Sequence, residues 1–371
     1  MSADVSQAAK PERRPTIRRL AIAGPPAALG ASHGERYAAE IRRYAEDRVN
    51  LASDGSWAGR PASRDDVLRL AQSMLPAHRA YAPDLCDEME AMAAACGLSA
   101  AEAVIVGGFT DFVDAVRPLA SGVHEEDDCT AVLVPDALAD GHGYLAQTWD
   151  MHDSATEHVV LLEIRPAQGP RAHVFSTVGC LGQIGINEAG IAIGINNLSA
   201  AVGGPGVTWP FVVRKALQQT AIEAALACVM DADLAGAHNY LLLDAEGRGF
   251  NVEAMPDCRH VEPLEAAPLV HTNHCLDAET RRHEASKPPA LIESSQRRLR
   301  RARQLLDDRA VDLALLMAMT RDAEAICQRS QPPHHMESSG AAIMRPASGD
   351  FWAVWGVPAD NEYERLQLGR R

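Results

Sequence analysis

One cysteine stands at the junction between two different kinds of sequence. The segment HEEDDCTAVLV places Cys129 directly after an acidic stretch and at the first position of an expected strand. A thiol there could begin a core strand as a small apolar residue, or it could act as a nucleophile. If the chain is cut between Asp128 and Cys129, the cysteine becomes N-terminal and carries a free α-amino group. Because that amine has a pKa of about 8 and the thiol one of about 8.5, the amine can accept the thiol proton without a histidine.

Several common catalytic and metal-binding motifs are absent from the sequence. The P-loop pattern G-x-x-x-x-G-K-[ST] and the zinc-protease pattern H-E-x-x-H do not occur, and GCLGQIG lacks the spacing of a dinucleotide fingerprint. None of the eight cysteines forms a C-x-x-C pair. His334 and His335 are adjacent, and adjacent residues on regular structure do not converge on one ion. We therefore expect no metal and no cofactor.

The composition excludes several classes of partner. Fifty acidic residues against 35 basic ones give a net charge of −15, which disfavours a nucleic-acid partner, because binding phosphates needs a surplus of lysine and arginine. No apolar run reaches the roughly 18 residues of a membrane span, and the start of the chain lacks the apolar segment of a secretory signal. Eight cysteines among 371 residues are too few for a disulfide scaffold. These features predict a globular, cytoplasmic protein with no nucleic-acid or membrane partner.

The elements expected on the two sides of Cys129 differ. Upstream, apolar residues recur mostly at helical spacing, which predicts one strand at 17–24 and then helices at 35–51, 65–75, 84–96 and from Ser99 onward. Ser99 and Glu102 have the S-x-x-E spacing of a capping box at the start of the last of these helices. Downstream, short apolar or alternating runs divided by Gly, Asp and Pro are typical of strands, with helices at 210–232, 293–308 and 311–319. The segment NYLLLDAEGRGFNVEA predicts a hairpin with AEGRG as its loop. Two blocks of strands with helices between and around them predict a layered α+β domain rather than a βαβ nucleotide-binding fold.

The sequence that starts at Cys129 resembles a known family. CTAVLVPDALADGHGYLAQTWDMH is similar to the start of the mature chain in the acyl-CoA:6-aminopenicillanate acyltransferase family. These are self-processing N-terminal-nucleophile (Ntn) proteins that also include β-alanyl-amine hydrolases. GCLGQIGINEAGIAIGINNLS, HNYLLLDAEGRGFNVEAMPD, VHTNHCLD and SSQRRLRR resemble further family segments, and GPPAALGASHGERY resembles part of the family's propeptide. The similarity runs in order over about residues 18–356.

The resemblance implies a fold and a division of the chain. The fold is the Ntn-hydrolase form of the α+β class, a four-layer αββα sandwich in which two stacked antiparallel sheets lie between layers of helices. The division is a disordered tail at 1–17, a helical propeptide or α chain at 18–128, and a catalytic β chain at 129–371. The peptide bond between the α chain and the β chain would be cut when the Cys129 thiol attacks the carbonyl carbon of Asp128.

The resemblance also implies roles for residues within its motifs. Cys129 is the nucleophile, Asp150 holds the α-ammonium group over the thiol, and Asn273 donates to the oxyanion of the tetrahedral intermediate. Asp150 and Asn273 also have an ordinary structural interpretation, since both stand at expected strand ends. Three polar residues at the ends of expected strands, Asn196, Asn197 and Glu253, are weaker candidates for substrate binding. Ser338 is a further candidate, because it keeps the place of a family serine before the closing strand.

Two departures from the family pattern bear on the function. Ser339 stands where the family has an arginine, and the substrate role of that arginine is therefore not carried over to this chain. Asp128 precedes the nucleophile where the acyl-CoA:6-aminopenicillanate acyltransferase has glycine. With no basic cluster for a phosphorylated donor, the sequence favours hydrolysis of a small N-acyl amide through an acyl-enzyme on Cys129.

Two other interpretations stay open. One is transfer of an acyl group from acyl-CoA or an amide to an amine, and the other is a non-catalytic sandwich that binds a small molecule. The expected partner is a small N-acyl amide or thioester. An association of the two cleaved chains, and a homo-oligomer, are compatible with the enzymatic interpretations.

Overall fold

The computed structural model describes residues 16–54, 61–116, 129–307, 309–332 and 335–369. Residues 1–15 of the expected tail, and the expected cleavage residue Asp128, lie outside these ranges. Within them the chain forms two sheets that stack face to face, with β2 and β3 of one sheet against β7 and β8 of the other.

The larger sheet has eight strands, which are antiparallel apart from the first pair, where β1 runs parallel to β4. In spatial order they are β1 (Arg18–Gly24), β4 (Val159–Pro166), β5 (Ala172–Thr177), β6 (Ile184–Asn187), β7 (Ile191–Leu198), β8 (Ala237–Asp244), β9 (Gly249–Ala254) and β10 (Arg259–Pro263). The expected hairpin is confirmed as β8 and β9, which pair antiparallel across a short turn.

The smaller sheet has six strands, all antiparallel to their neighbours. In spatial order they are β11 (Leu269–His271), β2 (Thr130–Val134), β3 (Tyr144–His152), β12 (Met336–Arg345), β13 (Asp350–Trp355) and β14 (Glu364–Gln367). The strand that begins after Cys129 is therefore flanked by β11 on one side and β3 on the other.

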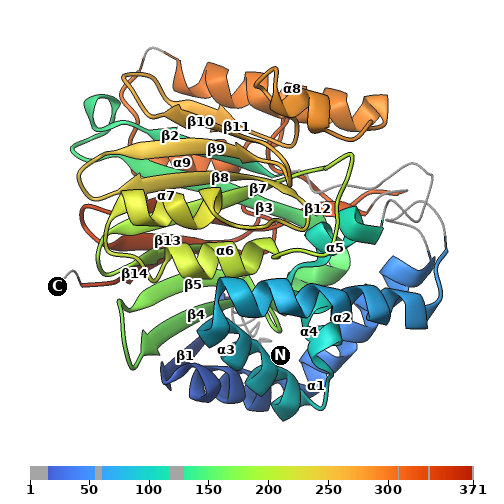
Figure 1. The fold of residues 1–371 in the computed structure, drawn as a ribbon. Helices are drawn as coiled ribbons and strands as arrows, with labels where there is room; N and C mark the ends of the chain where they lie inside the picture. Colours follow the sequence, from blue (N-terminus) through green and yellow to red (C-terminus); the bar gives the residue numbers. More distant parts are fainter. Residues whose placement is uncertain (1–15, 55–60, 117–128, 308, 333–334, 370–371) are drawn as a thin grey trace, which may run out of the picture.

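Helices cover the outer face of each sheet (Figure 1). On the larger sheet, α6 (Trp209–Ala216) contacts β7, and α7 (Ile222–Met230) contacts β8 and β9. On the smaller sheet, α8 (Pro289–Leu306) contacts β11 and β2, and α9 (Leu313–Thr320) contacts β12 and β3. This arrangement confirms the expected αββα sandwich.

The upstream part of the chain is mostly helical, as expected, and packs beside the larger sheet (Figure 1). Its helices are α1 (Pro26–Asp54), α2 (Arg64–Tyr81), α3 (Pro83–Cys96), α4 (Ala100–Gly107) and α5 (Phe109–Val116). The contact of α1 with α3 depends on Gly30, because a Cβ there would lie 1.8 Å from the carbonyl oxygen of Glu88. The predicted capping box is present, with Ser99 and Glu102 bonded to each other's backbone N–H.

One predicted helix end is wrong. The pattern places the end of a helix before Pro76, whereas α2 continues through that proline to Tyr81. A proline inside a helix removes one backbone hydrogen bond, but the loss is tolerated where packing holds both sides. Met74 and His78, on either side of Pro76, are both buried.

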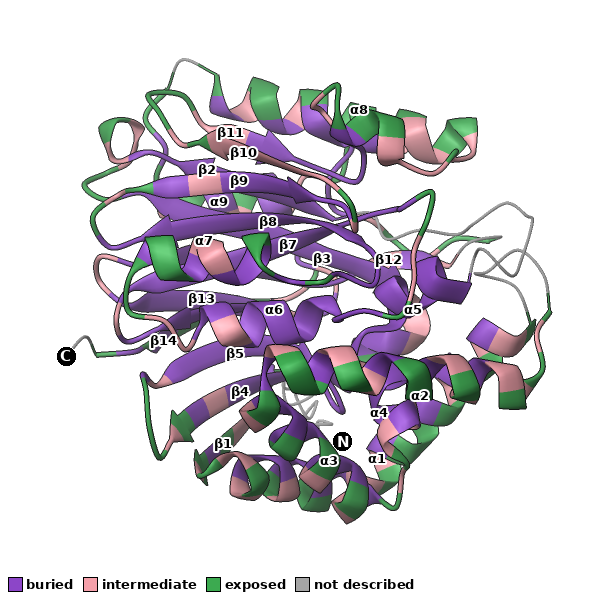
Figure 2. Cartoon of the chain, in the orientation of Figure 1, coloured by how far each residue is buried: buried purple, intermediate pink, exposed green. Residues whose placement is uncertain are grey.

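The core lies between the sheets and under the helices. Figure 2 shows the central strands buried along nearly their whole length, while the helices are exposed on their outer faces. Among the described residues, no single helix is both long and apolar enough to cross a membrane; α3 and α4 meet that test only as a pair and are bent by 107° at their junction.

Candidate active site

Cys129 directly precedes β2 and is 1% exposed. Its sulfur accepts a hydrogen bond from the backbone N–H of Asp150 at 3.4 Å and lies 3.7 Å from the carbonyl oxygen of the same residue. The register explains the contact. Because Thr130 is paired with Thr148, continuation of the two strands brings Cys129 beside the end of β3, where Asp150 stands.

Asn273 reaches the same place from the other side of β2. β11 pairs with β2 so that His271 lies opposite Ala131, and the chain continues two residues further to Asn273. Strand β2 thus has Asp150 on its neighbour β3 and Asn273 just beyond the end of its other neighbour, β11. All three predicted catalytic residues are buried in one region of the smaller sheet.

A buried arginine connects Cys129 with Asn273. Arg298 of α8 is fully buried, and its Nη1 donates to the carbonyl oxygen of Cys129 and, at 3.2 Å, to the hydroxyl of Thr130. Its Nη2 donates to Oδ1 of Asn273 at 3.1 Å. Because a guanidinium only donates, the amide oxygen of Asn273 must face the arginine and the amide nitrogen must face away from it.

The remaining contacts of Asn273 hold both its side chain and its backbone. The amide Nδ2 donates to the carbonyl oxygen of Asn197 at 3.0 Å, which uses one of its two N–H groups. The backbone N–H donates to Ser295 Oγ at 2.9 Å, and the backbone carbonyl accepts from the Lys287 ammonium. An asparagine anchored at four points is oriented in advance, which is what an oxyanion donor requires.

Asp150 is fully buried and lies next to a bulge in the sheet. Ser338 of β12 is paired with Asp150, and the register shifts between Ser338 and Gly340. Bulges occur often beside active sites, where they redirect a side chain. The Ser338 hydroxyl accepts from the backbone N–H of Gln328 at 2.9 Å, so Ser338 links β12 to the loop after α9. Ser339, which replaces the family's arginine, is also buried and shares a hydrogen bond of 2.8 Å with Thr156.

The other three candidates for substrate binding are placed differently. Asn196 donates to Asn239 Oδ1 at 3.0 Å on the neighbouring strand, within the larger sheet. Asn197 offers its backbone carbonyl to Asn273, so it supports the proposed oxyanion donor. Glu253 lies under the loop that carries Asn273 and accepts from His271 Nε2 at 2.8 Å.

The charge of Glu253 is stabilised by that loop. Burial alone would raise the pKa of Glu253. The hydrogen bond and electrostatic attraction of His271 outweigh that effect, together with hydrogen bonds from the Thr280 hydroxyl and the Leu276 backbone N–H, and lower the pKa to about 2. Glu253 is therefore placed to hold the segment from β11 to the 3₁₀ helix η4 (Thr280–His283) in position.

Arg298, Ser295 and Lys287 are not among the site residues predicted from the sequence. The sequence pattern could have indicated two of them, because Ser295 and Arg298 fall on the buried face of α8. The buried positions of this helix recur at helical spacing: Ser295, Arg298, Leu299, Ala302 and Leu306. An arginine on the buried face of an amphipathic helix needs partners inside the protein. No comparable pattern marks Lys287, which lies just before the helix.

A cavity of about 400 Å³ lies beside the loop that follows α9, and neither Cys129, Asp150 nor Asn273 is among the described residues that line it. Gln328 lines it and bonds Ser338, and Cys327 lines it with a thiol whose pKa is raised by burial and by the Asp150 carboxylate. The described residues that line it are Leu291, Arg297, Ala323, Cys327, Gln328, Arg329, Gln331, Pro332 and Met336. The cavity thus combines apolar walls with two arginines.

Comparisons with known proteins identify a family. The family model for acyl-coenzyme A:6-aminopenicillanic acid acyl-transferase matches residues 138–359. The 40 kDa form of the acyl-coenzyme A:6-aminopenicillanic-acid-acyltransferase of Emericella nidulans is 25% identical over 259 residues, covering 68% of each chain. An 8-amino-7-oxononanoate synthase of Mycobacterium sp. (strain KMS) is 32% identical over 145 residues, which span 38% of this chain and only 36% of the synthase.

Two solved structures are similar at low sequence identity. A mutant of conjugated bile acid hydrolase from Clostridium perfringens has 11% identity and a TM-score of 0.42, covering 65% of this chain and 97% of that one. Penicillin V acylase from Agrobacterium tumefaciens has 11% identity and a TM-score of 0.36, covering 65% and 86%.

Proposed function

The chain belongs to the acyl-coenzyme A:6-aminopenicillanic acid acyl-transferase family, and from that premise we propose that it is a self-processing cysteine amidohydrolase that cleaves a small N-acyl amide. The observation that carries the proposal is the bridge made by Arg298, which bonds the Cys129 carbonyl and the Asn273 amide oxygen at once. A nucleophile and an oxyanion donor held by one rigid group keep their relative positions throughout the reaction.

Self-processing requires only groups of this chain and water. The Cys129 thiol attacks the carbonyl carbon of Asp128, the peptide C–N bond breaks, and the nitrogen leaves as the free α-amine of Cys129. Water then hydrolyses the thioester, which leaves a carboxylate on Asp128 and returns the thiol. The products are residues 1–128, the α chain, and residues 129–371, the catalytic β chain.

Substrate hydrolysis follows the same steps on an external amide. The α-amine of Cys129 takes the thiol proton, and the thiolate attacks the acyl carbon. The second N–H of Asn273 Nδ2, which the Asn197 carbonyl does not use, donates to the negative oxygen that develops. The protonated amine then gives its proton to the leaving amine, and water releases the acyl group from sulfur.

Asp150 is suited to stabilise the charge that moves to the amine. Its backbone already contacts the Cys129 sulfur, and its side chain is fully buried. A carboxylate close to an ammonium group favours the protonated amine, and the attraction is larger where water is excluded. The cavity beside the loop after α9, whose residue Gln328 bonds Ser338, is the proposed place for the substrate.

The same acyl-enzyme could react with an amine in place of water, which would make the protein an acyltransferase. The family includes the 40 kDa acyltransferase form in Emericella nidulans, which is the observation that favours this second function. Mass spectrometry of the products, with water alone and with added amine, distinguishes the two. A product joined to the amine in preference to the free acid would replace hydrolysis by transfer.

The first test is the intact mass of the purified protein. We expect two fragments, 1–128 and 129–371, and we expect Cys129→Ala to remain a single chain of 39.8 kDa with no turnover, since one sulfur performs both attacks. Cys228→Ala, which removes a buried thiol of α7, is the matched control and should be cut normally. If Cys129→Ala is still cut at this bond, the mechanism is wrong; if the native chain stays intact at every pH and temperature tested, self-processing is wrong.

A further inference from the structure

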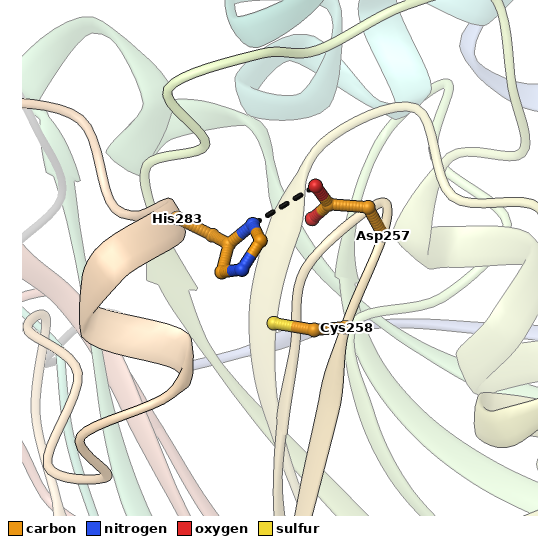
Figure 3. A group of neighbouring side chains, drawn as sticks. All are labelled: Asp257, Cys258 and His283. Carbon is orange, nitrogen blue, oxygen red and sulfur yellow. Dashed lines mark hydrogen bonds and ion pairs between the residues drawn. The ribbon is translucent and has the colours of Figure 1, made fainter.

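Three metal-ligating side chains of different types meet at a surface turn that does not include Cys129. Asp257 and Cys258 lie in the turn between β9 and β10, and His283 ends the 3₁₀ helix η4 (Figure 3). One potential ligand atom from each lies within 4.8 Å of the other two. His283 Nδ1 and Asp257 Oδ2 are 2.9 Å apart.

The local backbone explains why two adjacent residues can point to one place. Along a strand, successive side chains point to opposite faces of the sheet. Asp257 and Cys258 are not in a strand, because β9 ends at Ala254 and β10 begins at Arg259. Figure 3 shows both side chains directed toward His283 from this turn. The expectation of no metal rested on sequence motifs, and this cluster combines residues from two separate segments.

The chemistry of the three groups selects the ion. A thiolate, an imidazole and a carboxylate together suit zinc, which binds all three and prefers four ligands in a tetrahedron. Such a zinc holds its ligand atoms roughly 3.3–3.8 Å apart, so this cluster has to contract by about 1 Å from its present limit of 4.8 Å. Water completes a three-residue site of this kind.

Carboxylates lie beside both nitrogens of the histidine ring. Asp257 is bonded to Nδ1, and Glu279 Oε1 lies 3.7 Å from Nε2. A histidine that binds a metal through one nitrogen usually donates the N–H of the other to a carboxylate. When Nδ1 binds the ion beside Asp257, Glu279 Oε1 is the carboxylate oxygen that faces Nε2, at 3.7 Å. The Asp257 side chain is 61% exposed, which leaves a path for the ion from solvent.

The segment that follows His283 leads to the candidate active site. The carbonyl of His283 accepts from Ala201 N at 2.9 Å, and Ala285 N donates to Ser199 O at 2.8 Å. Two residues later, the buried Lys287 ammonium bonds the carbonyl of Asn273. Residues 283–287 thus join the end of β7 to the proposed oxyanion donor. An ion at His283 would tie the start of this segment to the β9–β10 turn.

We propose that Asp257, Cys258 and His283 form a zinc site that restrains residues 279–287. Binding replaces the thiol proton of Cys258 by the metal and releases that proton to solvent, with no change in oxidation state. The site is separate from the proposed nucleophile, so its test does not depend on turnover. We expect the bound ion to slow backbone hydrogen exchange across residues 279–287.

Calorimetric titration of zinc chloride into the metal-stripped, reduced protein tests the site. We expect one equivalent to bind, and Cys258→Ser and His283→Ala each to weaken binding at least tenfold. His142→Ala is the matched control: its ring lies 3.6 Å from Asp136 on another exposed turn without a thiol, and it should bind zinc as the native protein does. Absence of saturable binding, or equal binding by the native protein and Cys258→Ser, overturns the proposal.

Cobalt identifies the sulfur. A tetrahedral cobalt thiolate gives a charge-transfer band, which we expect to persist in Cys129→Ser and to disappear in Cys258→Ser. The opposite result would place the metal on the proposed nucleophile and overturn the site. Hydrogen exchange measured with and without zinc tests the restraint, and unchanged exchange across residues 279–287 would overturn that part of the proposal.

Discussion

Arg298 donates to the side-chain oxygen of Asn273 across 3.1 Å, and this bond determines which way the asparagine amide faces. An asparagine side chain can rotate by 180° and exchange the positions of its amide oxygen and nitrogen at little cost, unless a group that can only donate faces the oxygen. With the guanidinium on the oxygen, the nitrogen is turned toward the Asn197 carbonyl and keeps one further N–H. The orientation that an oxyanion donor needs is therefore imposed by a residue of α8.

Replacing Asn273 by alanine should reduce kcat by roughly 100- to 1000-fold with little change in KM, because the lost hydrogen bond is made mainly in the transition state. Self-cleavage can survive, since the chain itself holds the scissile peptide. Asn187→Ala is the control, because that buried asparagine lies in β6 of the larger sheet and bonds the carbonyls of Leu217 and Gln219. It should lower the melting temperature and leave kcat nearly normal. The same pattern in Asn273→Ala would remove Asn273 from the catalytic residues.

Replacing Arg298 by lysine should lower kcat by roughly 10- to 100-fold while KM changes little. An ammonium group keeps the charge but lacks the planar fork that reaches both Cys129 and Asn273. Arg300→Lys, on the exposed face of the same helix, should behave as the native protein. Steady-state kinetics of the two variants provide the comparison. Native kcat in Arg298→Lys would show that the bridge does not position the reacting groups.

Glu253 should make the stability depend on pH in acid. Its pKa is lowered from 4.5 to about 2 in the folded protein, so the stabilisation is fully present above about pH 4.5 and is lost as the pH falls toward 2. The shift corresponds to a contribution on the order of 3 kcal/mol.

Urea unfolding of native protein and Glu253→Gln, between pH 7 and pH 2, measures this contribution. The difference in unfolding free energy between the two proteins should be largest at neutral pH and should shrink near pH 2. Glu265→Gln, at an exposed position, should match the native protein throughout. A difference that stays constant with pH would mean that Glu253 contributes by packing and not by its charge.

After cleavage the two fragments should remain one particle, because α5 is bonded into the downstream chain. Asp114 accepts from the backbone N–H groups of Ala200 and Ala237 at 2.9 and 3.1 Å, and Asp111 accepts from that of Trp209 at 2.6 Å. Asp114→Ala leaves two buried donors without that acceptor and should lower the melting temperature by roughly 2–5 °C.

Native mass spectrometry and melting curves of the cut protein test this association. Asp87→Ala removes a surface carboxylate that pairs with Arg79 and is 57% exposed, so it should cost little. Separate elution of the fragments under native conditions would contradict the prediction, as would equal melting temperatures for Asp114→Ala and the native protein.

The sequence alone was sufficient for the features that depend on near neighbours. The capping box at Ser99, the hairpin of β8 and β9, and most helices follow from spacings of two to four residues. The family motifs also singled out Cys129, Asp150 and Asn273. Local periodicity did not foresee that α2 passes through Pro76, because the packing that tolerates the proline comes from residues distant in the chain.

Only the tertiary structure decided how the predicted residues are joined. Arg298 lies 169 positions from Cys129 in the sequence. It reaches the Cys129 carbonyl because β11 and β3 flank β2 in a fixed register and α8 packs on β11 and β2. The cluster of Asp257, Cys258 and His283 likewise depends on a turn meeting a distant 3₁₀ helix. Residue types and their local spacing can be read directly from the sequence. The order and register of the strands arise only when both sheets are buried against each other, and that order and register bring distant side chains within bonding distance.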